Sequence, residues 1–207
     1  GDGLSLSLET PHQPGAWRLI GWAEDPDGQV ALASRSFEVP ASAERPEGSI
    51  GLPFWVGDHY AASGFMGDVD GLVTGSCADS SDPCAPACQS WTWTPTSGGW
   101  AGVYWQYPAN NWGSQTGLRL AAGATAITFE AWADREGLTA SFFAGLSDSF
   151  RVELEDVALS TTPTTYRIDL SEADYREVIG AFGWSTSTPA DGLPMTLSVR
   201  DLRWEGP

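Results

Sequence analysis

The chain has 207 residues, 42% of them apolar, enough for one substantial hydrophobic core and at most part of a second domain. It contains no lysine, and ten arginines against 27 carboxylates give a formal net charge of -17. Such a surface repels phosphate backbones, so we expect no nucleic-acid partner. The sequence has no apolar run of membrane-spanning length, so we expect no membrane insertion. Calcium, neutral glycans and basic partners remain compatible with this charge.

The first 40 residues predict a short β segment. An alternating run at residues 4–8 precedes two strand-like runs, residues 17–24 and 29–39, which flank the turn sequence at residues 25–28 (Asp-Pro-Asp-Gly). Residues 1–40 resemble the closing hairpin of an immunoglobulin-like bacterial domain, which needs roughly 100 residues when complete. Three strands leave an apolar face and an edge without a partner. Either the rest of the domain lies upstream in a longer chain, or these strands pack on the main domain or on another subunit.

A linker is predicted at residues 41–51, which lack a strand pattern and contain Pro46. Residues 52–207 predict one domain of about ten short strands, a length that suits a jelly roll. Alternating runs such as residues 126–129 and 195–199, separated by Gly, Pro and Asp turns, favour an all-β sandwich. Residues 171–179 predict a short helix or a loop, because Ser171 precedes an Asp by three positions.

Three cysteines, Cys77, Cys84 and Cys88, lie in one loop rich in Asp, Ser and Pro. A disulfide between Cys77 and Cys88 would hold such a loop and indicates an oxidising compartment. Cys84 is an equally good partner for either neighbour, because connectivity is not readable from sequence. Zinc is the competing interpretation, but neither His12 nor His59 has ligand spacing to these thiols.

Residues 100–113 have the composition of a sugar-binding site, with five large aromatic residues, one glutamine and two asparagines. Flat rings stack on the apolar faces of pyranoses, and amides serve hydroxyl groups as donor and acceptor. The alternative is that Tyr104, Trp105 and Tyr107 fill a sandwich core. Trp112 fits that alternative poorly, because it lies in a turn between Asn111 and a glycine.

Strand alternation divides this block between two faces. Residues 100, 102, 104 and 106 point one way and residues 103, 105 and 107 the other, so only one of Tyr104 and Trp105 faces a ligand groove. Trp184 shares a face with Phe182 on a late strand and is a second stacking candidate, with core packing as its alternative. The predicted ligand-binding residues are Trp105, Gln106, Tyr107, Asn110, Asn111, Trp112 and Trp184.

Several stretches together resemble the jelly-roll, carbohydrate-binding-module-like domains of secreted bacterial glycan-degrading and surface proteins. Two positions differ from that family's pattern, because Arg200 stands where an Asp is frequent and Glu130 where a Trp is frequent. The resemblance covers roughly three quarters of the chain and implies a β-sandwich, secretion and glycan binding without hydrolysis. The stretches that carry it are residues 52–60, 63–68, 99–113, 123–129, 166–170, 178–184 and 197–202.

One structural calcium ion is the predicted cofactor. Asp68 and Asp70 place two carboxylates on an extended bend bounded by glycines, and hard cations prefer oxygen ligands. Asp58 and Asp201 lie on what the resemblance makes the first and last strands, which neighbour each other in such sandwiches. The alternative is a set of turn-forming and solvent-facing acids.

Catalysis has less support in the sequence. A glycosidase needs two carboxyl groups roughly 5 to 9.5 Å apart across one groove, and the spacing of Glu130, Glu136, Glu153 and Glu155 pairs none of them in that way. A serine triad needs a histidine near a nucleophile elbow, and neither histidine has that context. We therefore do not expect an enzyme.

Together these features predict a non-catalytic, extracellular or cell-surface module whose partner is a glycan. The first alternative is an extracellular structural or filament subunit that self-assembles through the strands of residues 1–40. The second is a polysaccharide-cleaving enzyme. The chain does not begin with methionine, so we also expect it to be a processed or excised segment.

Overall fold

The computed structural model describes residues 15–24, 30–39, 49–80, 82, 84–145 and 150–206, the first two ranges as backbone only. The chain divides into two compact units, Gly1–Gly48 and Ser49–Pro207. The predicted strand at residues 4–8, the predicted turn at residues 25–28 and residues 41–48 of the predicted linker lie outside the described residues. Among the described residues, no helix has the length and apolar character needed to cross a membrane.

The first unit contains an antiparallel hairpin of β1 (Gly15–Glu24) and β2 (Val30–Val39). Their register is unbroken from the pair Gly15 and Val39 to the pair Glu24 and Val30. The two strands predicted here are therefore confirmed. Their assignment to an immunoglobulin-like domain stays a prediction.

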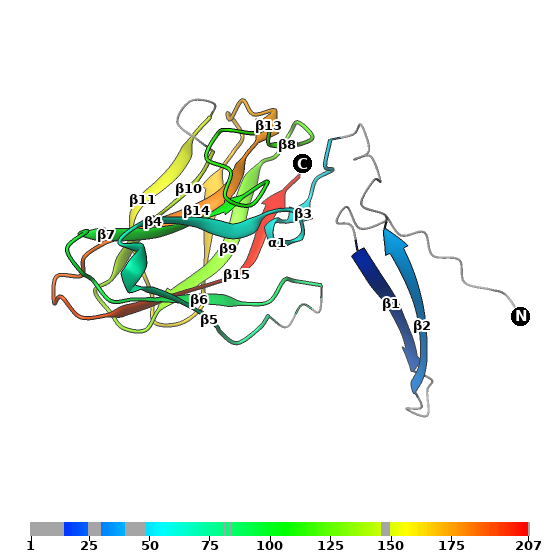
Figure 1. The fold of residues 1–207 in the computed structure, drawn as a ribbon, viewed down its shortest axis with the longest axis horizontal. Helices are drawn as coiled ribbons and strands as arrows, with labels where there is room; N and C mark the ends of the chain where they lie inside the picture. Colours follow the sequence, from blue (N-terminus) through cyan, green and yellow to red (C-terminus); the bar gives the residue numbers. More distant parts are fainter. Residues whose placement is uncertain are drawn as a thin grey trace, which may run out of the picture. The chain divides into compact units, whose positions relative to one another are not determined.

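The second unit is a jelly-roll β-sandwich of two antiparallel sheets (Figure 1), as the alternating runs predicted. The five-stranded sheet has the order β11 (Val152–Ala158), β10 (Thr139–Ala144), β14 (Gly180–Ser187), β7 (Trp100–Gln106), β4 (Ala61–Gly67). The other sheet has the order β12 (Thr164–Asp169), β9 (Ala126–Ala133), β15 (Met195–Glu205), β6 (Gln89–Trp93), β5 (Leu72–Ser76), with β3 (Phe54–Trp55) paired to β15.

Shorter elements complete this unit. A two-stranded sheet joins β8 (Leu118–Arg119) to β13 (Glu177–Val178), α1 (Val56–His59) follows β3, and a 3-10 turn occupies Val69–Gly71. Residues 171–176 form a turn and loop that lead into β13, so the loop alternative of the prediction is confirmed. The Asp169 carboxylate accepts a hydrogen bond of 3.0 Å from the backbone amide of Ser171, where this turn begins.

Aromatic side chains from both sheets fill the space between them. Trp91 of β6 meets Trp105 of β7 edge-on with ring centroids 5.1 Å apart, and Phe129 of β9 meets Phe182 of β14 at 4.8 Å. These edge-to-face contacts add to the large apolar area that each ring buries. The indole Nε1 of Trp204, on β15, also donates a buried hydrogen bond of 3.0 Å across the core, to a carbonyl of β14.

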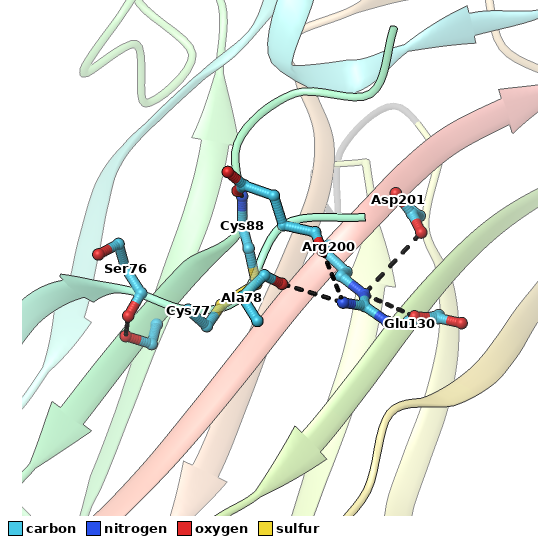
Figure 2. Close-up of a disulfide and its surroundings, with 9 residues drawn as sticks. Ser76, Cys77, Ala78, Cys88, Glu130, Arg200 and Asp201 are labelled. Atoms are coloured by element: carbon cyan, nitrogen blue, oxygen red, sulfur yellow. Dashed lines mark hydrogen bonds and ion pairs between the residues drawn. A yellow bond between two sulfur atoms is a disulfide. The ribbon is translucent and has the colours of Figure 1, made fainter. Parts of the chain in front are cut away.

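The loop between β5 and β6 is closed by the predicted disulfide between Cys77 and Cys88 (Figure 2). Cys84 is a free, exposed thiol in the same loop. Asp79 stabilises the closed loop from within, because its carboxylate accepts a hydrogen bond of 2.8 Å from the Cys88 amide.

Arg200 of β15 fastens this loop to the outer face of the six-stranded sheet (Figure 2). Its guanidinium donates to the carbonyls of Ala78 at 2.9 Å and Asp79 at 3.1 Å. The same group forms an ion pair of 2.7 Å with Glu130, its cross-strand neighbour on β9. Arg200 and Glu130 therefore form one contact that also holds the loop.

Replacing both bridged cysteines in the variant C77S/C88S should lower the free energy of unfolding. The bridge joins residues 11 positions apart, and closing a loop of that size restricts the unfolded chain by about 2–3 kcal/mol. Urea unfolding followed by tryptophan fluorescence measures the difference. Cys84→Ser is the matched control and should leave the midpoint unchanged, so an equal loss in both variants would contradict the assignment.

Candidate functional site

The two faces of β7 have different surroundings. Ala101, Val103 and Trp105 point into the core and are almost completely buried. The alternate residues of the strand, from Trp100 to Gln106, lie on the outer face of the five-stranded sheet. Trp100 keeps 44% of its surface exposed. Any site formed by this strand is therefore built on the even-numbered residues.

Trp105 and Trp184 do not face a ligand groove, which corrects their prediction as stacking residues. Their exposed fractions are 4% and 1%, and both rings contact Trp91 in the core. The even-numbered residues of β7, which include Tyr104, face outward. The cross-strand neighbours of Tyr104 are Gly64 and Gly183. Glycine supplies no side chain for a core, so this face of the sheet is left for rings that lie on its surface.

The outer rings pack directly against glycines of the sheet. A Cβ at Gly180 would overlap the ring of Tyr104, and one at Gly183 would lie 2.6 Å from the ring of Phe143. The rings of Tyr104 and Phe143 are neighbours, with centroids 5.5 Å apart. Burial raises the pKa of the Tyr104 phenol, although the positive charge of Arg151 acts in the opposite direction. Tyr104 is therefore a neutral floor residue.

Asn111 shapes the loop that follows β7, and it is completely buried. Its side-chain amide donates to the carbonyls of Tyr107 at 3.1 Å and Gln115 at 2.8 Å. Its side-chain oxygen accepts from the amides of Gly113 and Gln115, both at 3.1 Å. With donors and acceptor all engaged in the loop, Asn111 supports the site and does not contact a ligand, which corrects its prediction.

Gln106 has the same supporting role and is also completely buried. Its amide donates to the carbonyl of Asn111 at 2.8 Å, so the last residue of β7 holds the loop from below. The loop in turn presents Trp112, of which 51% is exposed and whose ring lies 6.1 Å from that of Tyr104. Trp112 is the predicted residue that reaches the outer face, and the prediction for Gln106 is corrected.

The two remaining predicted residues lie at the edge of this arrangement. Tyr107 is partly buried, and its ring meets the core residue Tyr60 edge-on at 6.4 Å. Asn110 is exposed, and its backbone lies in the left-handed region with φ 61°. Its backbone amide donates a hydrogen bond of 2.9 Å to the Ser63 hydroxyl. Neither residue lines the hollow described next.

Trp100 and Trp112 border a hollow of about 180 Å³ on the outer face, which we name the apolar hollow. The guanidinium of Arg151 lies 4.3 Å above the ring of Phe143 and forms an ion pair of 2.9 Å with Glu153. A cation held over a ring face in this way is oriented before any ligand arrives. The apolar hollow is lined by Met66, Trp100, Tyr104, Trp112, Phe143, Gly145, Arg151 and Ser185.

A second hollow of about 200 Å³, the polar hollow, adjoins the first along the same face. It shares Trp100 and Ser185 with the apolar hollow. Its wall consists mainly of hydroxyl side chains and one carboxylate. The polar hollow is lined by Trp100, Thr139, Ala140, Ser141, Asp156, Ser185, Thr186 and Ser187.

Sequence reasoning missed most of the residues that line the two hollows, including Trp100, Tyr104, Phe143 and Arg151. For Trp100 and Tyr104, the sequence did contain a signal. Glycines are frequent on β4 and β14, the two strands that pair with β7. Phe143 and Arg151 come from a different part of the chain. The pairing of β10 with β14 brings Phe143 to this face, and the pairing of β11 with β10 brings Arg151, which directly precedes β11.

The four aspartates predicted to bind calcium have different surroundings. Both Asp68 oxygens accept hydrogen bonds of 2.6 Å from Thr96, and these bonds lower the pKa of the Asp68 carboxyl. Asp201 has one buried oxygen that accepts no hydrogen bond from the described residues. Across the described part of the chain, however, Asp58, Asp68, Asp70 and Asp201 contribute to no cluster of three metal-ligating side chains. Calcium binding stays a prediction.

No protein-family model and no curated protein matches the chain. Among solved structures, it is similar to one concerning the promiscuous specificity of carbohydrate-binding modules from the β-sandwich superfamily, with 12% identity and a TM-score of 0.42 over 93% of this chain and 74% of that one. It is also similar to the family 11 carbohydrate-binding module of a cellulosomal cellulase of Clostridium thermocellum, with 14% identity and a TM-score of 0.39 over 71% and 97% of the two chains. A third similar structure is a family 29 carbohydrate-binding module, with 15% identity and a TM-score of 0.36 over 72% of this chain and 85% of that one. Identities this low carry no function to this chain.

The variant Asn111→Ala should disorder the loop that carries Trp112. It leaves four backbone groups of the loop without their buried partner, at a cost of about 2–4 kcal/mol of stability. Urea unfolding measures the loss, and acrylamide quenching of tryptophan fluorescence reports greater access to Trp112. Asn110→Ala, at the exposed neighbouring position, is the control for a general effect of loop substitution. An Asn111→Ala variant with unchanged stability would contradict the supporting role.

Proposed function

We propose that the protein binds a carbohydrate without cleaving it, on the outer face of the five-stranded sheet. The main support is that Trp100 and Trp112, each about half exposed, border a hollow that is also lined by the rings of Tyr104 and Phe143. Indole rings are among the largest apolar groups available, and exposing two of them together on one face favours a binding surface. The loop that presents Trp112 is held by the buried amides of Gln106 and Asn111.

The chemistry of the apolar hollow suits a sugar ring. The C–H face of a pyranose stacks on an indole, while the hydroxyl groups around its edge need donors and acceptors. The oriented guanidinium of Arg151 supplies donors, and the hydroxyl of Ser185 serves as donor or acceptor. Such a surface binds by stacking and hydrogen bonding and requires no ionisable catalyst.

The charge and the disulfide support an extracellular setting for this activity. The net charge of -17 disfavours anionic polymers as ligands, which leaves neutral glycans as the better match. The bond between Cys77 and Cys88 is typical of proteins made in an oxidising compartment. A secreted or surface-exposed module meets both conditions.

Truncating either exposed ring should weaken binding. We expect Trp112→Ala and Trp100→Ala each to reduce affinity about tenfold or more, because a buried stacking ring is typical of the residues that dominate binding energy. Affinity gel electrophoresis on soluble β-glucan, xyloglucan, glucomannan, xylan and galactan measures retention, and circular dichroism confirms the fold.

Trp132→Ala is the matched control, because Trp132 lies on the six-stranded sheet, partly exposed, with Arg200 5.3 Å from its ring. It should leave retention unchanged. Loss of retention in Trp132→Ala alone would move the site to the other sheet. Absence of retention of the unmodified protein on every polysaccharide would refute carbohydrate binding.

Self-assembly through the first unit is a second candidate role, favoured by the form of the hairpin. In the described residues β1 and β2 pair only with each other, so each strand has one unpaired edge. A two-stranded sheet is marginally stable in water by itself and gains from pairing with a further strand.

Analytical ultracentrifugation separates this role from glycan binding. If the hairpin mediates assembly, the full chain should sediment as oligomers whose fraction rises with concentration, and a variant lacking residues 1–40 should sediment as a monomer. The truncated variant should keep its polysaccharide retention. A full chain that remains monomeric up to about 100 μM, a concentration at which weak specific contacts of micromolar affinity are populated, argues against assembly.

A further inference from the structure

The two hollows form one groove divided by a tryptophan. Trp100 and Ser185 line both hollows, so the apolar and polar hollows adjoin each other at these two residues. Trp100 comes from β7 and Ser185 from its neighbour β14, where they are close in register. An indole at such a boundary offers its surface to groups on either side, which a single sugar unit would not require.

The walls of the polar hollow are held by hydrogen bonds of their own. The Thr186 hydroxyl donates to the carbonyl of Thr139 at 2.7 Å, and the Ser141 hydroxyl accepts from the amide of Asp156 at 3.0 Å. Asp156 has φ 48°, in the left-handed region that Asp tolerates better than most residues. The hydrogen bond from the Asp156 backbone amide to Ser141 therefore fixes the backbone at Asp156 and so orients its side chain.

The carboxylate of Asp156 is exposed and accepts no hydrogen bond from another described residue. Glu153, by contrast, is engaged with Arg151 at 2.9 Å. A carboxylate has only acceptor positions, so Asp156 selects ligand groups that donate hydrogen bonds. Sugar hydroxyls are such groups.

Arg151 places a cation that only donates hydrogen bonds in the apolar hollow, and Asp156 places an anion that only accepts them in the polar hollow. A neutral sugar chain satisfies both, because each hydroxyl donates and accepts. A chain carrying carboxylates meets repulsion at Asp156 in addition to the repulsion from the whole chain, and a cationic chain meets repulsion at Arg151. The pattern therefore discriminates by charge as well as by shape.

We propose that the groove takes two adjacent units of a neutral glycan, one in each hollow with Trp100 between them, and that Asp156 accepts hydrogen bonds from the hydroxyls of the unit in the polar hollow. This inference rests on the proposed carbohydrate-binding function. It adds to that function a minimum ligand length, a ligand charge and a residue that determines specificity.

The experiment is a titration of tryptophan fluorescence in the full chain at 25 °C. The probes are glucose, xylose, mannose and galactose, the soluble neutral polymers β-glucan, xylan, mannan and galactan, and the acidic polymer polygalacturonate. We expect the best neutral polymer to bind at least tenfold more tightly, per sugar unit, than its monosaccharide. We expect polygalacturonate to bind at least tenfold more weakly than that polymer.

Variants then test the role of Asp156. Asp156→Ala should weaken binding of the best neutral polymer about tenfold, the loss typical of a hydrogen bond to a charged group. Glu155→Ala is the matched control, because it removes the same charge from the adjacent exposed residue, which lines neither hollow. It should change affinity less than twofold.

Each outcome has a separate meaning. Monosaccharides that bind as tightly as the polymers overturn the two-unit groove and leave carbohydrate binding intact. Equal losses in Asp156→Ala and Glu155→Ala, or none in either, overturn the assigned role of Asp156. Tight binding of polygalacturonate overturns the neutral ligand. If none of the sugars or polymers binds, the proposed function itself fails, and this inference fails with it.

Discussion

The sandwich depends on how β7 divides its side chains between two environments. Its odd-numbered residues complete the aromatic core, where Trp105 packs against Trp91 of the facing sheet. A strand in this position has no freedom to rotate, because a slip of one residue would place Trp100 and Tyr104 in the core and bring Trp105 to the surface. The orientation of the outer face is therefore a consequence of how the core is filled. The exposed rings are held in place by the stability of the whole domain.

Much of the architecture could be predicted from the sequence, because its signals are local. Alternating runs and turn residues indicated an all-β sandwich, and the crowded loop indicated a disulfide, whose partners the structure then showed to be Cys77 and Cys88. The same logic placed Trp112 outside the core, since a ring between two turn-forming residues has no strand to bury it. What failed was the choice between the two faces of β7. Alternation separates the faces, but the inner one is decided by partner strands, here by Gly64 and Gly183 opposite Tyr104.

The misassigned amides show a second limit. Asn111 and Gln106 have the chemistry of sugar ligands and of loop supports equally, because backbone carbonyls and sugar hydroxyls are recognised by the same groups. Burial decides between these roles, and burial is not a property of the residue type. Arg151 and Asp156 lay beyond prediction for another reason. They reach the groove from β10, β11 and their connections, through strand pairings between parts of the chain that are distant in sequence.

The contact between Arg200 and Glu130 has a consequence for how this chain can vary. The two residues face each other across β15 and β9, and Arg200 also holds the carbonyls of Ala78 and Asp79 (Figure 2). Replacing Arg200 by an acid alone would set two carboxylates side by side beneath a row of carbonyl oxygens. Replacing Glu130 alone would remove the nearer counter-charge of the guanidinium and leave only Asp201, 4.0 Å away. The two side chains therefore depend on each other, and a change at one position favours a compensating change at the other.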